Sequence, residues 1–207
     1  MVALEAKRKR VSAAEKKRRA IREAVWPSLD EERLWRRLES TGFITIPRTL
    51  PLIVEIINCM TKGKPAGGAY FELWCRSFDE CFVDMDDEDG MAFSTGFSGQ
   101  RATSTWKERI RALQGLGFID VQTRGGKSYA LIYNPYQVIY QHHLDKTPGL
   151  TSDHYTALEI RVAGIGANDL GEARRMVEEK AAAVAKVAKT TLTKATKKPV
   201  SGAAKAE

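Results

Sequence analysis

The sequence has 207 residues, of which 43% are hydrophobic and 29% charged, with a formal net charge of +7 at pH 7. This length accommodates one domain with flanking segments or two small domains, and it excludes a large barrel enzyme. The composition is that of a soluble globular chain, and its basic excess favours a polyanionic partner. No apolar run approaches the ~18 residues that a membrane span requires, so we expect a cytoplasmic protein with no membrane partner.

The basic charge is concentrated at the two ends of the chain. Residues 1–25 carry nine Lys/Arg against three Glu, and residues 172–207 carry nine against four Glu. The part between them is therefore mildly acidic, and its own charge is segregated. Residues 72–90 hold one Arg against eight acids, whereas residues 97–127 hold six Lys/Arg against two acids. A small basic surface beside a strongly acidic one is more informative than the net charge.

The first 68 residues divide into a basic arm and a helical region. Residues 1–27 hold few large apolar side chains, so we expect a disordered segment or a solvated helix that orders on a partner. Residues 28–68 are expected to be helical. A capping box at Ser28 opens the first helix, and Thr49 caps a second that ends at Gly63.

The stretch 69–143 is the most informative part of the chain. A helix is predicted from Ala69 to Val83, followed by an acidic loop and one or two helical turns over 91–97. A second, strongly amphipathic helix starts at Thr103 or Ser104 and has Trp106, Ile110 and Leu113 on one face. Two strands then flank a glycine turn, Arg124-Gly125-Gly126-Lys127, where positive φ is needed. The order is helix, turn, helix and two-stranded ribbon.

This region resembles the winged helix-turn-helix DNA-binding domains of bacterial regulators and of plasmid replication or maintenance proteins. Ala92 and Gly96 stand four residues apart, as small residues do in such motifs. The phrase Arg109–Ile119 ends in Leu-Gly-Phe-Ile, which is similar to the end of their recognition helices, and a glycine wing with basic residues follows. We therefore expect a mainly helical fold with a small β-hairpin, in which the winged helix is accompanied by additional packed helices and flexible basic termini.

A recognition helix reads base edges in the major groove with side chains near its N-terminus. With Trp106 and Ile110 buried, the outward positions of this helix include Ser104, Glu108 and Arg111. An arginine at position 101 or 111 is suited to guanine. Glu108 is expected to accept from cytosine, to orient Arg111 or to pair with Arg101. The residues predicted to contact DNA are Arg101 just before the helix, Thr103, Ser104, Thr105, Lys107, Glu108 and Arg111 on the helix, and Arg124 and Lys127 on the wing.

The C-terminal part is expected to form a helical extension over 144–171 and an Ala/Lys-rich basic tail over 172–207. Such tails add salt-dependent, sequence-independent affinity for nucleic acid. Residues 172–189 also have the pattern of a helix with weak apolar contacts, which is one route to a dimer. Because many winged-helix proteins bind as dimers to paired half-sites, a homodimer is the expected oligomer.

Other chemistry is not predicted. The acidic segment 84–90 resembles a calcium loop, but its glycine comes one place late and Thr95 stands where the bidentate Glu should be. Cys59, Cys75 and Cys81 are predicted to be small core residues. The histidines form no metal-ligand pattern with them, and Val121 stands where a phosphate loop needs its first glycine. We therefore expect no metal, no cofactor, no catalytic residue and no small-molecule substrate.

The sequence thus predicts a double-stranded DNA-binding protein, either a transcriptional regulator or a replication or maintenance factor of a bacterial plasmid or mobile element. It would be associated with the nucleoid or a plasmid. The alternative is a winged-helix protein-interaction module in a larger assembly, with basic tails that give only non-specific affinity.

Overall fold

The computed structural model describes residues 13–37 and 40–195. The chain divides into two compact units, Met1–Phe43 and Ile44–Glu207. The basic arm and tail were predicted over ranges that include 1–12 and 196–207, and these parts of the predictions lie outside the described residues. Within the described ranges, no helix is both long enough and apolar enough to cross a bilayer.

The first unit contains the helix α1 (Ala13–Val25) and the short 3-10 helix η1 (Glu31–Arg33). The predicted helix starting at Ser28 is wrong. The Asp30 side chain accepts a hydrogen bond from the Glu32 backbone N–H and caps η1, and Leu34 then returns to extended backbone. None of the residues of η1 is buried, so tertiary packing does not stabilise a longer helix here.

The second unit starts with two helices that supply much of the core. They are α2 (Leu50–Met60) and α3 (Gly67–Arg76). Ile53, Ile56 and Ile57 of α2 are fully buried. Thr49 occupies the N-cap position of α2, but its side chain makes no capping bond. Its Oγ1 instead lies 2.5 Å from the Tyr136 hydroxyl, on a helix 87 residues away in the sequence.

The predicted helix over 69–83 is confirmed only as far as Arg76, where α3 ends. Ser77 is extended at the C-cap, and its hydroxyl donates to the Trp74 carbonyl. Cys81 has a φ of 59°, a left-handed conformation that a helix excludes. The next residues form the strand β1 (Phe82–Asp84). Cys75 and Cys81 are exposed and only Cys59 is half-buried, so their prediction as core residues is not borne out.

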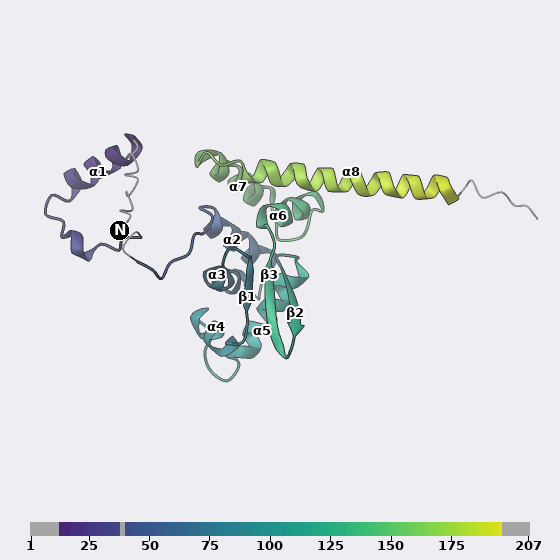
Figure 1. Cartoon of the computed structure of the whole chain (residues 1–207), viewed down its shortest axis with the longest axis horizontal. Coiled ribbons are helices and arrows are strands. Elements are labelled where there is room, and N and C mark those ends of the chain that lie inside the picture. The colour runs from purple at the N-terminus through teal and green to yellow at the C-terminus, as the bar shows by residue number, and fades with distance from the viewer. Residues whose placement is uncertain (1–12, 38–39, 196–207) are drawn as a thin grey trace, which may run out of the picture. The chain divides into compact units, whose positions relative to one another are not determined.

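The centre of the second unit is a helix pair and a three-stranded antiparallel sheet, whose first strand precedes the helices in the sequence (Figure 1). After β1 come α4 (Glu88–Ser94) and α5 (Ala102–Gly115), then β2 (Ile119–Arg124) and β3 (Lys127–Ile132). The strand order is β1-β3-β2, so β3 is central. In the hairpin, Gly125 and Gly126 have φ of 62° and 82°, as the predicted turn requires.

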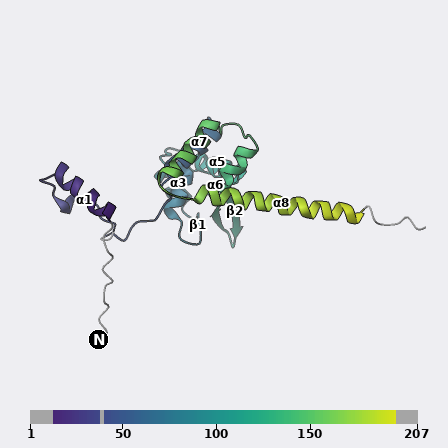
Figure 2. The same cartoon turned by 90° about the horizontal axis from the view of Figure 1, so that it is seen from above.

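Three more helices complete the unit: α6 (Pro135–Leu144), α7 (Ser152–Gly164) and α8 (Asp169–Ala195). The helix α6 was not predicted, although Asn134 caps it through the Tyr136 N–H and Pro135 fills its first turn. Leu170 and Ala173 at the start of α8 are buried. From Glu178 to Lys186 every residue of α8 is exposed, and Figure 2 shows this helix continuing past α6.

Candidate nucleic-acid interface

The helix α5 is fixed by one buried face. Trp106 and Leu113 are fully buried and Ile110 nearly so, as predicted. The opposite face is in solvent, and Ser104, Glu108, Arg111 and Gly115 are all exposed on it. The sequence therefore identified correctly which side of α5 is available to a ligand.

The N-terminus of α5 is held by its own backbone. The Arg101 carbonyl accepts a hydrogen bond from the Thr105 N–H at 2.8 Å and from the Ser104 hydroxyl at 2.9 Å. The Ser104 hydroxyl is thus satisfied within the helix, and Thr105 is half-buried. The Arg101 side chain itself is exposed, and no partner for it is found in the described part of the chain.

Three of the predicted contact residues are bound by the acidic stretch, which we define as the carboxylates of Asp84, Asp86, Asp87, Glu88 and Asp89. Lys107 Nζ lies 2.8 Å from Glu88 Oε2. Lys127 Nζ contacts Asp86 and lies 3.8 Å from Asp84. The Thr103 hydroxyl donates to Asp89.

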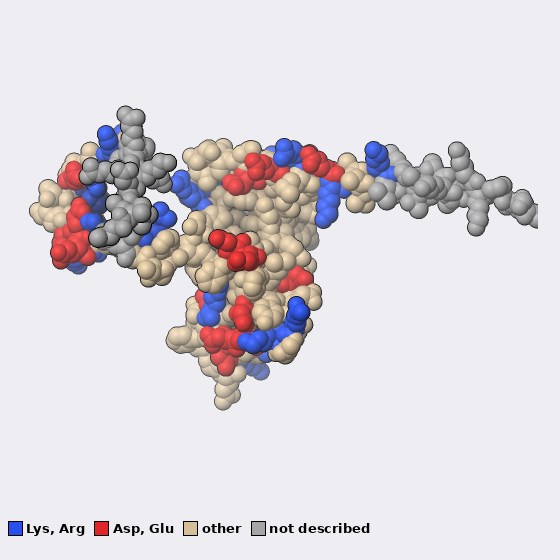
Figure 3. Space-filling view, viewed as in Figure 1, with Lys and Arg blue, Asp and Glu red and all other residues tan. Residues whose placement is uncertain are grey.

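This clustering is visible on the surface. Figure 3 shows acidic and basic side chains side by side over the part of the molecule where Figure 1 labels α4, α5 and the hairpin. Hydrogen bonding to Asp86, together with the negative charge of Asp86 and Asp84, raises the pKa of Lys127 above its usual value, so this side chain stays cationic.

Glu108 has different partners from those expected. Its carboxylate lies 3.3 Å from Lys64 Nζ and 3.3 Å from Arg109 Nη1, and in the described part of the chain it forms no ion pair with Arg101 or Arg111. The hydrogen bond and charge of Lys64 are the main causes that lower the pKa of Glu108. Lys64 belongs to the loop between α2 and α3, so only the tertiary fold brings it to α5.

Arg109 is not part of the available basic surface, although it adds to the positive charge of this region. Only 12% of its side chain is exposed. Its guanidinium lies over the Phe97 ring, 5.7 Å from the centroid, and so it anchors the turn between α4 and α5. That turn contains Gly96 and Gly99, both with positive φ.

Among the described residues, three predicted arginines remain without an ion pair: Arg101, Arg111 and Arg124. Arg111 lies on α5, Arg101 is the N-cap residue just before it, and Arg124 ends β2 opposite Lys127 in the hairpin. The acidic stretch binds both lysines of the predicted site but none of these arginines.

His142 fixes the other end of α5, a role that the sequence did not indicate. Its Nε2 donates to the Leu116 carbonyl at 2.8 Å, since a carbonyl only accepts, and its Nδ1 lies 2.9 Å from the Thr147 hydroxyl. The ring also stacks on Phe118 at a centroid distance of 6.3 Å. The helix α6 therefore holds the end of the predicted recognition helix in place.

Other polar clusters offer no comparable site. Cys59 Sγ lies 3.5 Å from His154 Nε2 and 3.6 Å from Glu55, but burial and the Glu55 carboxylate raise the pKa of this thiol and so disfavour a thiolate. No group of three His, Cys, Asp or Glu residues able to bind a metal occurs in the described ranges.

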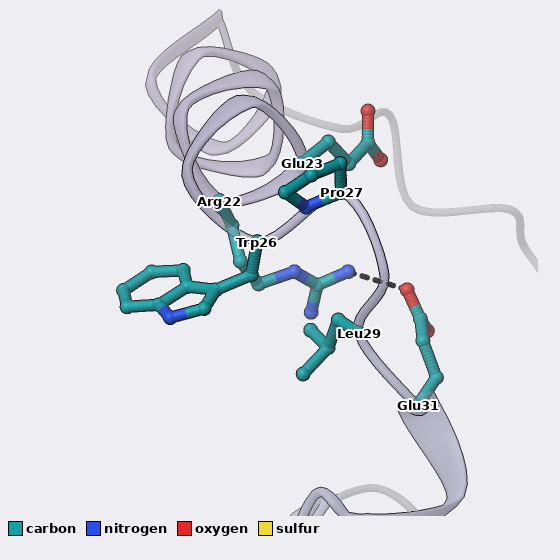
Figure 4. Close-up of a pocket in the computed structure, with 6 residues that line it drawn as sticks. All are labelled: Arg22, Glu23, Trp26, Pro27, Leu29 and Glu31. Carbon is teal, nitrogen blue, oxygen red and sulfur yellow. Dashed lines mark hydrogen bonds and ion pairs between the residues drawn. The ribbon is translucent and has the colours of Figure 1, made fainter.

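A small pocket in the first unit lies between the end of α1 and η1 (Figure 4). Its lining includes Arg22, whose guanidinium is already paired with Glu31 at 2.6 Å.

Comparison with protein families, with curated proteins and with solved structures finds no match to this chain.

Proposed function

We propose that residues 67–133 form a winged helix-turn-helix that binds double-stranded DNA, with α5 in the major groove and the β2–β3 hairpin on the flanking backbone. The order α3, β1, α4, α5, β2, β3 and the antiparallel sheet β1-β3-β2 support this proposal. The observation that carries it is that Arg111 on α5 and Arg101 at its N-cap are exposed and have no ion-pair partner among the described residues, while the other face of the helix is buried.

The proposed roles follow from the chemistry of each group. Arg111 and Arg101 present planar guanidinium groups that can donate two hydrogen bonds to guanine O6 and N7. Arg124 at the hairpin would contact phosphates or the minor groove. Lys107 and Lys127 would add phosphate contacts, which carry no sequence information. The cellular role would be transcriptional regulation, or replication or maintenance of a plasmid or mobile element.

The test starts with the full-length protein and a pool of random duplexes, from which a preferred site is selected. Arg111→Ala should reduce the preference for that site over random duplex about 5- to 150-fold, because a bidentate contact contributes ~1–3 kcal/mol of discrimination. The matched control is Arg161→Ala, which removes an exposed arginine from α7. If both variants retained the full preference of the wild type, this placement of α5 would be abandoned.

A protein-interaction module is the second candidate, and the outer face of the sheet favours it. Phe82 and Leu131 are cross-strand neighbours that are 46% and 41% exposed, and Phe78 just before β1 is 81% exposed. An exposed apolar patch of this kind is typical of docking surfaces. Leu131→Glu should leave DNA affinity unchanged if the interface is α5. If the sheet face docks a protein instead, Leu131→Glu should abolish that complex, whereas Arg111→Ala should leave it intact.

A further inference from the structure

The acidic stretch touches the proposed interface at several points. Glu88 pairs with Lys107 of α5, Asp86 pairs with Lys127 of the hairpin, and Asp89 accepts from Thr103. These contacts connect the segment around the start of α4 to both parts of the molecule that would meet a duplex.

Both lysines remain within reach of a ligand. Their side chains are 48% and 53% exposed, so a phosphate oxygen could replace the carboxylate partner. Exposed ion pairs of this type contribute little to stability, which makes such an exchange inexpensive. The arginines of the interface differ, because Arg101, Arg111 and Arg124 have no carboxylate to displace in the described part of the structure.

We propose that the acidic stretch determines how many cations of the interface are available to DNA phosphates. In the free protein, Asp86 and Glu88 form ion pairs with Lys127 and Lys107. A duplex therefore first meets Arg101, Arg111 and Arg124, which have no ion-pair partner among the described residues. Lys107 and Lys127 contact DNA only where the sugar-phosphate backbone fits closely enough for phosphate oxygens to replace their carboxylate partners. The acidic stretch therefore lowers sequence-independent affinity. This inference rests on the proposed function.

Removing one carboxylate should change the salt dependence of binding in a predictable way. Each additional phosphate contact steepens the slope of log affinity against log salt by about 0.9 for B-DNA. Asp86→Asn frees Lys127 from its main partner, so we expect an affinity for random duplex about two- to fivefold higher at low salt. The slope should become steeper by up to about 0.9.

Two controls separate the release of Lys127 from the loss of a negative charge. Asp79→Asn removes the same charge from an exposed carboxylate in the loop before β1, where no described lysine pairs with it. Lys127→Met removes the cation itself, so Asp86→Asn added to this variant has no lysine to release.

The measurement is the affinity of the full-length variants for one random duplex at several salt concentrations. The inference predicts that Asp86→Asn steepens the slope of log affinity against log salt in the wild-type protein but not in the Lys127→Met variant. It also predicts that Asp79→Asn steepens this slope less than Asp86→Asn does. An equal gain in both backgrounds, or an equal gain from Asp79→Asn, would overturn it while leaving the proposed function intact. Failure of the wild-type protein to bind any duplex at low salt would overturn both.

Discussion

At the scale of single residues, the buried bond between Thr49 and Tyr136 is a direct test of the fold. Both residues are almost fully buried, and the bond joins the start of α2 to α6. Burial raises the pKa of the Tyr136 phenol, so the group is a neutral hydroxyl near pH 7. A buried hydroxyl that loses its partner keeps the cost of leaving water.

Tyr136→Phe should therefore lower the free energy of unfolding by ~1–3 kcal/mol, as measured by urea denaturation. Thr49→Val combined with Tyr136→Phe removes both hydroxyls and should recover much of this loss. If the single variant were as stable as the wild type, the two residues would not be joined in solution.

The structural states of the residues in the proposed interface were predictable to different extents. The buried and exposed faces of α5 followed from the spacing of Trp106, Ile110 and Leu113, since helical periodicity alone decides them. The ion-pair partner of each charged side chain could not be predicted from this spacing. Lys64 reaches Glu108 from the α2–α3 loop, and Asp86 reaches Lys127 over 41 residues of sequence. Such ion pairs depend on the tertiary fold, which no local pattern contains.

At the scale of elements, two glycines of the proposed interface should respond in opposite ways to alanine. Gly126 has a φ of 82° in the hairpin, a conformation that costs an L-residue ~1–2 kcal/mol. Gly115 ends α5 in exposed helix, and a Cβ added there meets no atom within 4 Å. Nothing within the described fold therefore requires glycine at position 115.

Gly126→Ala should lower the free energy of unfolding by ~1–2 kcal/mol. Gly115→Ala should raise it by up to ~0.5–1 kcal/mol, because alanine is the better helix former. If the backbone of α5 approaches DNA closely at this point, Gly115→Ala should nevertheless weaken duplex binding. Thermal denaturation and binding titrations measure the two effects separately. An unchanged affinity would show that the end of α5 lies away from the duplex.

The elements that sequence patterns predicted best are those whose partners are local. The β2–β3 hairpin follows from its two glycines, and α5 from its periodicity. The strand β1 was missed because Phe78, Cys81 and Phe82 continue a helical apolar spacing. Pairing with β3, which follows more than 40 residues later, is what makes β1 a strand. The short η1 shows the converse, since a capping signal without a buried face does not produce a long helix.

At the scale of the whole molecule, the basic charge lies outside the part that carries the proposed interface. Residues 1–43 have a net charge of +5 and residues 187–207 one of +4, so the remaining 44–186 has −2 of the total +7. The first turns of α8 belong to the core, because Leu170 and Ala173 are buried there. A truncated protein without the tail should therefore keep residues up to Lys186, instead of ending before residue 172.

The truncated protein 44–186 should bind all duplexes more weakly than the full chain, with a flatter dependence on salt, because fewer phosphates are neutralised. Its preference for the selected site should be retained, since α5 is intact. Fluorescence anisotropy with the selected site and with random duplex measures both quantities. Loss of the preference on truncation would place sequence recognition in the terminal segments.

The most direct test of base recognition by α5 combines a protein change with a DNA change. Guanines of the selected site are replaced one at a time by 7-deazaguanine, which lacks the N7 acceptor that a bidentate arginine needs. We predict that at one position this replacement weakens DNA binding by the wild-type protein but does not change DNA binding by the Arg111→Ala variant. Equal weakening of both proteins at every position, with the same result for Arg101→Ala, would contradict the account.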